Sequence, residues 1–353
     1  MNSIIPISKY DLSSKKFDKK VLKKDKPKAL AYVYDKIIYE ENDNSYEYII
    51  FANGNRAKDI SKDGEHPYGR RDYVGRIKEY FNTKKKNIII VHILVDNDAP
   101  LNLEAQIIAN YIDRISQCKN TNSISLIGHS KCGAMFFNTP KYFKQESSFE
   151  KTHIYTSATP YQGCLIATPK LFLKQVKNVI DIQLPFPLNI LTYNALEMYY
   201  SSISSNSHMD NDIALPGYVT DNYDPQFIAK MFDEENIRAI KKVHGFCNII
   251  TGIDDETIYK YLERKDFTSV GMCLMDLFFM EETTDGFIEV KSQESVSKHL
   301  DVNSIRINST SHYYLAHNDE LGIVLDIVNE NIDKYNEEKN DKRLSKKISE
   351  LVR

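Results

Sequence analysis

Short apolar runs alternate with a helix-like segment through the first half of the chain. Four runs rich in β-branched and aromatic residues cover residues 46–52, 87–94, 123–127 and 152–157, and such runs are typical of buried strands. Between the second and third runs, residues 101–118 repeat leucine and isoleucine at spacings of three to five, which gives a helix one apolar face. A crossover helix of this kind joins parallel strands. The sequence therefore predicts an α/β fold with a mostly parallel central sheet flanked by helices.

This alternation stops after Thr168 and returns at Gly245. The intervening residues 170–244 hold a Pro-interrupted aromatic stretch and a polar patch, and we interpret them as an inserted helical cap. The cap is either a lid over an apolar substrate or a peripheral subdomain packed on the sheet. The predicted organisation is a basic tail at 1–28, an α/β core at 29–169 and 245–335, and a charged tail at 336–353. The second part of the core is predicted to contain strands at 245–252 and 304–309 and a helix at 319–335.

Composition excludes several classes of function. With 46 basic and 49 acidic residues, the net charge of -3 provides no basic surface of the kind that nucleic-acid binding needs. The five cysteines contain no Cys-x-x-Cys pair, so neither a disulfide framework nor a zinc site is predicted, and we expect no metal and no cofactor.

The N-terminal residues carry no recognisable signal peptide, and no stretch has the ~18 apolar residues of a spanning helix. We therefore expect a cytoplasmic protein, with non-classical secretion left open. Eight lysines lie between residues 15 and 28. They form either a solvated tail or a site of transient contact with an anionic membrane surface.

The third predicted strand leads directly into Gly128-His129-Ser130-Lys131-Cys132-Gly133. A serine hydroxyl is a poor nucleophile until a base takes its proton, and it must project into a cleft to meet a substrate. A sharp turn between strand and helix projects the serine, and small neighbours let the two elements approach closely. The amides at the start of the following helix then face the position where negative charge develops. Ser130 is the predicted nucleophile.

These residues resemble the G-x-S-x-G elbow of lipases and esterases of the α/β-hydrolase fold, with Cys132 in place of the last glycine. Residues 53–56, Asn-Gly-Asn-Arg, are similar to the His-Gly-x stretch after the family's third strand, with Asn53 replacing histidine. The resemblance implies an oxyanion hole made by the backbone amides of Asn55 and Lys131. Residues 158–163 are similar to the Thr-Pro-His-x-Gly stretch that shapes lipase sites.

Residues 284–292 resemble the family's Asp-Gly-x-Val-x-x-x-Ser stretch, whose aspartate is the acid of the catalytic triad. The resemblance implies that Asp285 is this acid and that His312 is the base, because the fold uses the chain order Ser, Asp, His. Two alternatives stay open. Asp254 or Asp255 also follows a predicted strand and could serve as the acid, and His317 could replace His312. Lys131 is a weaker candidate base, because the residue after the serine of an elbow points its side chain away.

The sequence thus predicts a serine hydrolase that cleaves carboxylic esters through an acyl-enzyme on Ser130. The aromatic cap and the resemblance to lipases favour esters of lipids as its substrates. The same fold also supports thioesterases and peptidases. A further alternative, favoured by the departures at Asn53 and Cys132, is an inactive hydrolase-fold protein that binds a ligand or partner.

Overall fold

The structure is a computed structural model of the 353-residue chain. It describes residues 8–11, 30–37, 45–53, 73–84, 86–94, 100–164, 226–253, 288–308 and 318–351, together with residues 167, 177, 181, 185–190, 194, 212, 259, 263, 284–285, 310 and 312.

The described strands form one sheet with the order β1-β2-β4-β3-β5-β6-β7-β8. The six strands from β4 to β8 pair in parallel, whereas β1 and β2 pair antiparallel at one edge. The prediction of a mostly parallel sheet is therefore confirmed. The strands are β1 (Ser8–Asp11), β2 (Leu30–Ile37), β3 (Tyr46–Asn53), β4 (Ile88–Leu94), β5 (Thr121–His129), β6 (Thr152–Ser157), β7 (Gly245–Thr251) and β8 (Asn303–Ile307).

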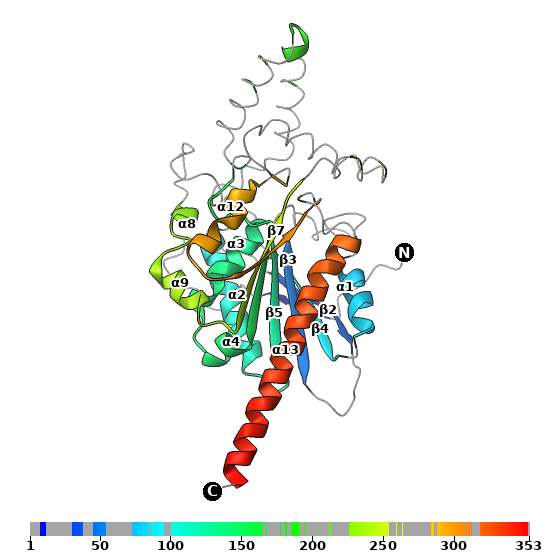
Figure 1. Cartoon of the computed structure of the whole chain (residues 1–353), viewed down its shortest axis with the longest axis vertical. Helices are drawn as coiled ribbons and strands as arrows, with labels where there is room; N and C mark the ends of the chain where they lie inside the picture. The colour runs from blue at the N-terminus through cyan, green and yellow to red at the C-terminus, as the bar shows by residue number, and fades with distance from the viewer. Residues whose placement is uncertain are drawn as a thin grey trace.

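Helices cover both faces of the sheet (Figure 1). The longer ones are α1 (Tyr73–Asn82), α2 (Leu101–Ser116), α3 (Lys131–Asn138), α9 (Glu234–Ile240) and α13 (Asn318–Leu351). The shorter ones are α4 (Glu146–Lys151), α8 (Gln226–Ala229), α12 (Val290–Glu294) and the 3-10 turns η2 (Thr139–Tyr142) and η4 (Ser295–Lys298).

Alternation along each strand divides the buried side chains into two cores. On β3, Ile50 packs with α2 and α3 on one face of the sheet, whereas Ile49 packs with α1 and α13 on the other. The apolar face predicted for residues 101–118 is present in α2. Eleven of the sixteen residues of this helix are buried, Glu104 among them. Both faces of the strands are covered, which explains why they read as nearly continuous apolar runs.

Three features bear on the predicted division of the chain. β1 lies within the range predicted as a basic tail. α8 and α9 lie within the predicted cap, yet Phe227, Met231 and Ile240 belong to the same core as α2 and α3. α13 continues through residue 336 without a break and extends beyond the sheet toward the C-terminus (Figure 1). The domain boundaries themselves stay predictions.

Among the helices of the described residues, none is long and apolar enough to cross a membrane.

Candidate active site

Ser130 lies at the turn between β5 and α3, where the chain leaves the sheet. Its backbone has φ 57° and ψ −134°, and a positive φ is strained for a residue with a side chain. Two backbone hydrogen bonds of 2.8 Å hold the turn, one from the Ser130 amide to the Ser157 carbonyl and one from the Gly133 amide to the Ser130 carbonyl. A strained serine between a strand and a helix is what the sequence resemblance to a nucleophile elbow predicted at this position.

Two glycines allow α3 to pack tightly against the sheet. A β-carbon on Gly128 would lie 2.6 Å from the Cys132 carbonyl oxygen, and one on Gly133 would lie 1.9 Å from the Thr159 Oγ1 atom. Cys132, the departure from the lipase pattern, is fully buried in the core, and burial raises the pKa of its thiol to about 12. The protonated thiol packs as a small apolar group. The close approach thus depends on Gly133, one position later.

Asp285 and His312 form a buried pair, although 27 residues separate them. The Nδ1 atom of His312 lies 3.0 Å from the Asp285 Oδ2 atom, and the His312 amide donates to the Asp285 carbonyl at 2.7 Å. The Asp285 side chain has no exposed surface, and that of His312 is 6% exposed. A buried carboxylate on Nδ1 fixes the tautomer that leaves Nε2 able to accept a proton.

Several donors keep Asp285 ionised. Its Oδ2 atom accepts from Thr251 Oγ1 at 2.8 Å and from Gln293 Nε2 at 3.2 Å, and its Oδ1 atom accepts from the Ile288 amide at 2.9 Å. Burial alone would raise the pKa of Asp285, but the charge and hydrogen bond of His312, with the Ile288 and Thr251 donors, outweigh burial and lower it. The carboxylate therefore stays charged at neutral pH.

His129 connects the His312 loop to the elbow. Its Nε2 atom lies 2.8 Å from the His312 carbonyl oxygen, and the two imidazole centroids are 4.6 Å apart. A carbonyl only accepts, so Nε2 of His129 carries the proton. Burial, reinforced by the charge of His312, lowers the pKa of His129 to about 3, so this ring is neutral. Since His129 directly precedes Ser130, this contact brings the His312 loop against the serine turn.

The remaining predicted site residues differ in what the structure describes of them. Lys131 begins α3, and the residue is only 2% exposed. Asn55, Asp254, Asp255 and His317 lie outside the described residues. The oxyanion hole and the competing acid and base therefore stay predictions.

The sequence patterns did not single out three groups around the Asp285–His312 pair. Thr251 and Gln293 donate to Asp285, and His129 contacts the His312 carbonyl oxygen. Thr251 ends β7 and Gln293 lies on α12, eight residues after the acid. Their roles depend on tertiary packing, so no local pattern signals them.

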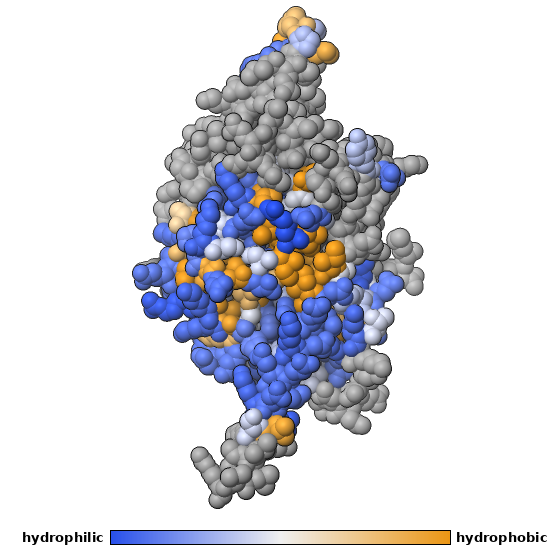
Figure 2. Space-filling model, in the orientation of Figure 1, coloured by the Kyte–Doolittle hydropathy of each residue, from blue (hydrophilic) through white to orange (hydrophobic). Residues whose placement is uncertain are grey.

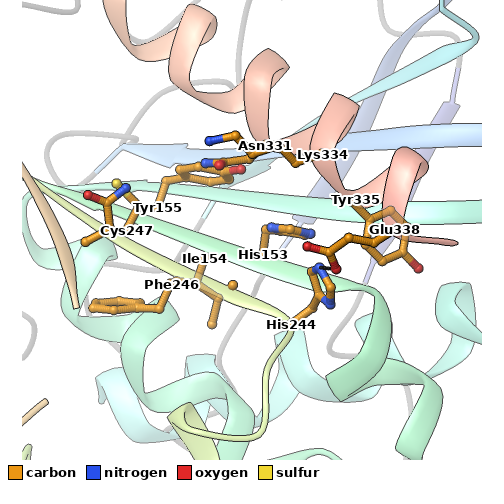
Figure 3. A pocket seen from close by; sticks show the side chains of 12 residues that line it. His153, Ile154, Tyr155, His244, Phe246, Cys247, Asn331, Lys334, Tyr335 and Glu338 are labelled. Carbon is orange, nitrogen blue, oxygen red and sulfur yellow. Dashed lines mark ion pairs between the residues drawn. The ribbon is translucent and has the colours of Figure 1, made fainter. Parts of the chain in front are cut away.

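A separate pocket of about 200 Å³ lies at the opposite, amino edge of the sheet. Figure 3 shows the imidazoles of His153 and His244 beneath Tyr335 and Glu338 of α13, and the His244 Nε2 atom lies 3.7 Å from a Glu338 carboxylate oxygen. No group of three or more His, Cys, Asp or Glu residues in the described part of the chain could hold a metal ion.

Comparisons with known proteins identify the fold. The sequence matches no protein-family profile and no curated protein. The structure is similar to the mature form of lipase BlEst2 from Bacillus licheniformis, with a TM-score of 0.51, 10% identity, and coverage of 85% of this chain and 97% of that chain. A lipase-esterase related protein from Clostridium acetobutylicum has a TM-score of 0.42 and 16% identity, with coverage of 82% of this chain and 96% of that chain. Est1E from Butyrivibrio proteoclasticus has a TM-score of 0.41 and 10% identity, with coverage of 88% of this chain and 96% of that chain. The chain has the α/β-hydrolase fold, as the sequence resemblance implied.

Proposed function

We propose that this α/β-hydrolase-fold protein is a serine hydrolase that cleaves carboxylic esters through an acyl-enzyme on Ser130. The observation that carries the proposal is the buried Asp285–His312 pair, held by His129 against the strained turn of Ser130. An ionised acid, a base with a fixed tautomer and a serine at a strained turn beside them are the parts that acyl transfer needs.

In the proposed mechanism, the Ser130 Oγ atom attacks the ester carbonyl carbon while His312 Nε2 takes the hydroxyl proton. Asp285 keeps the Nδ1 proton in place and stabilises the charged imidazole. The negative oxygen accepts hydrogen bonds from the backbone amides of Asn55 and Lys131. His312 then gives its proton to the leaving alcohol. Water attacks the acyl-serine with His312 again as base, releasing the carboxylic acid and restoring Ser130.

A lipid ester is the proposed substrate class. Three large apolar side chains are exposed within a short segment, Phe186 at 78%, Leu188 at 52% and Ile190 at 48%. The segment lies at the far end of the molecule from the C-terminus, and its surface is partly orange in Figure 2. An exposed apolar tip favours contact with an apolar phase, including transient contact with a membrane surface.

We therefore predict that the rate of hydrolysis of p-nitrophenyl esters rises with the length of the acyl chain. Activity confined to the acetate ester would contradict a lipid substrate.

The test of the nucleophile is Ser130→Ala. We expect kcat to fall by a factor of the order of 10³ or more, because the covalent step is lost. The variant should keep its circular dichroism spectrum and should no longer be labelled by a fluorophosphonate probe. Ser148→Ala, which alters a buried serine on α4 bound to Asp113, is the control and should keep both labelling and turnover.

Other outcomes distinguish the alternative functions. Ser130 labelling with turnover only of thioesters or peptides would assign the chain to another branch of acyl transfer. A wild-type chain that binds acyl ligands but is neither labelled nor active would contradict the proposal and favour an inactive binding protein.

A further inference from the structure

Gln293 is a completely buried amide beside the acid–base pair, and nothing in the proposed mechanism uses it. It lies on α12 between the acid loop and the end of β7, the strand that ends at Thr251. A buried amide must satisfy its two donor hydrogens and its acceptor, so its partners reveal what it holds in place.

Those partners lie on two separate segments. The Gln293 Oε1 atom accepts from the Thr251 amide at 2.8 Å, and Nε2 donates to the Thr251 carbonyl at 3.1 Å. The side chain thus pairs with β7 as a neighbouring strand would. The same Nε2 atom lies 3.2 Å from Asp285 Oδ2 and 3.3 Å from the Ile288 carbonyl. The amide therefore joins the rigid sheet to the loop that carries the acid.

The backbone of Gln293 is also fixed to the sheet. Its carbonyl accepts from Asn248 Nδ2 at 2.9 Å, and Asn248 Oδ1 accepts from Thr156 Oγ1 at 3.2 Å. A chain of buried hydrogen bonds thus extends from β6 through β7 to the carboxylate that holds His312. Such fully satisfied networks favour one conformation over its alternatives.

We infer that Gln293 is a positioning residue for the acid: its amide holds Asp285 Oδ2 at the end of β7 in the orientation that accepts the hydrogen bond from His312 Nδ1. This inference rests on the proposed function. Gln293 does not touch the substrate or the reacting atoms, and it acts through Asp285. Nε2 is a neutral donor, so it stabilises the carboxylate without adding charge near His312.

Two substitutions test this role. Gln293→Met keeps the length of the side chain but loses the donor to Asp285, and we expect kcat to fall about tenfold to a hundredfold with KM nearly unchanged. Gln293→Glu keeps the shape but puts an acid oxygen where Nε2 faces Asp285 Oδ2 and the carbonyls of Thr251 and Ile288. An acid group there carries at most one hydrogen, so it cannot donate to both Asp285 and the Thr251 carbonyl, and kcat should fall in the same direction as in Gln293→Met with KM nearly unchanged.

Ser295→Ala is the matched control. Ser295 follows α12 directly, is equally buried, and donates only to the Ser292 carbonyl within that turn among its described side-chain hydrogen bonds. It should leave kcat and KM as in the wild type. If Gln293→Met fails to fold, Gln293→Glu carries the test alone.

The NMR signal of the proton on His312 Nδ1 separates this inference from the proposed function, because that proton lies between His312 and Asp285 Oδ2. In Gln293→Met this signal should move or be lost by faster exchange with water, whether or not the chain turns over an ester. An unchanged signal, or kcat values in both variants equal to that of Ser295→Ala, overturns the role of Gln293. Failure of wild-type Ser130 to react with the fluorophosphonate overturns the proposed function instead.

Discussion

At the scale of single residues, the proposed chemistry depends on a carboxylate surrounded by donors. All described contacts of the Asp285 oxygens come from hydrogen-bond donors: His312, Thr251, Gln293 and the Ile288 amide. An uncharged amide cannot replace the carboxylate here, because its NH₂ group would face one of these donors wherever it pointed.

We therefore predict that Asp285→Asn lowers kcat by about 10⁴-fold, since the His312 tautomer would no longer be fixed. Steady-state turnover at neutral pH is the measurement. The matched variants are Asp254→Asn and Asp255→Asn, which should stay active. The reverse pattern would transfer the acid role to one of those two residues.

Local patterns predicted the turn at Ser130 but not the contacts around Asp285. The turn, with its flanking strand and helix, was predictable because periodicity and small residues act within a few positions. The proposed acid, Asp285, was suggested only by resemblance to a longer stretch. Thr251 and Gln293 were not, because a hydrogen bond between β7 and α12 leaves no trace in either segment. The antiparallel strand β2 was not predicted for a similar reason, because its place in the sheet depends on its pairing with β4.

At the scale of elements, the contact of α3 with the β6 end limits what the elbow tolerates. The β-carbon of Gly133→Ala would lie 1.9 Å from Thr159 Oγ1. We expect a loss of about 1–3 kcal/mol in the free energy of unfolding, measured by urea denaturation. Adding Thr159→Ala should recover part of the loss, because it removes the clashing oxygen.

The control is a glycine-to-alanine substitution at a position where the new β-carbon has no neighbouring atoms. A β-carbon on Gly322 of α13 meets nothing within 4 Å. Gly322→Ala should stabilise the protein by about 0.5–1 kcal/mol, because alanine loses less backbone entropy in a helix. Equal effects at both glycines would show that crowding at Gly133 is unimportant.

At the scale of the whole molecule, buried titratable groups at both edges of the sheet make the fold sensitive to acid. Burial, reinforced by the charge of His244, lowers the pKa of His153 to about 3. An unfolded histidine has a pKa of about 6.5, so the unfolded chain binds the proton first. The stability that depends on a neutral His153 is complete above about pH 6.5 and is lost as the pH falls toward 3. The lowered pKa of Asp285 adds a further loss below about pH 3.9.

We predict that the free energy of unfolding decreases steadily from pH 7 to pH 4, and that His153→Gln makes this decrease smaller. Denaturation at a series of pH values is the measurement. His299→Gln changes an exposed ring and should leave the slope as in the wild type. A slope unaffected by His153→Gln would mean that other groups control acid unfolding.

β8 is the outermost strand at its end of the described sheet, so it has a hydrogen-bonded neighbour on one side only. The segment that follows it carries His312, whereas Ser130 follows the central β5. Outer strands detach at lower free energy than central ones. The proposed catalysis is therefore expected to be the first property lost under mild denaturation. His312 would move away from Ser130 while most of the protein still kept its native structure, and recovery would need only that strand to pair again.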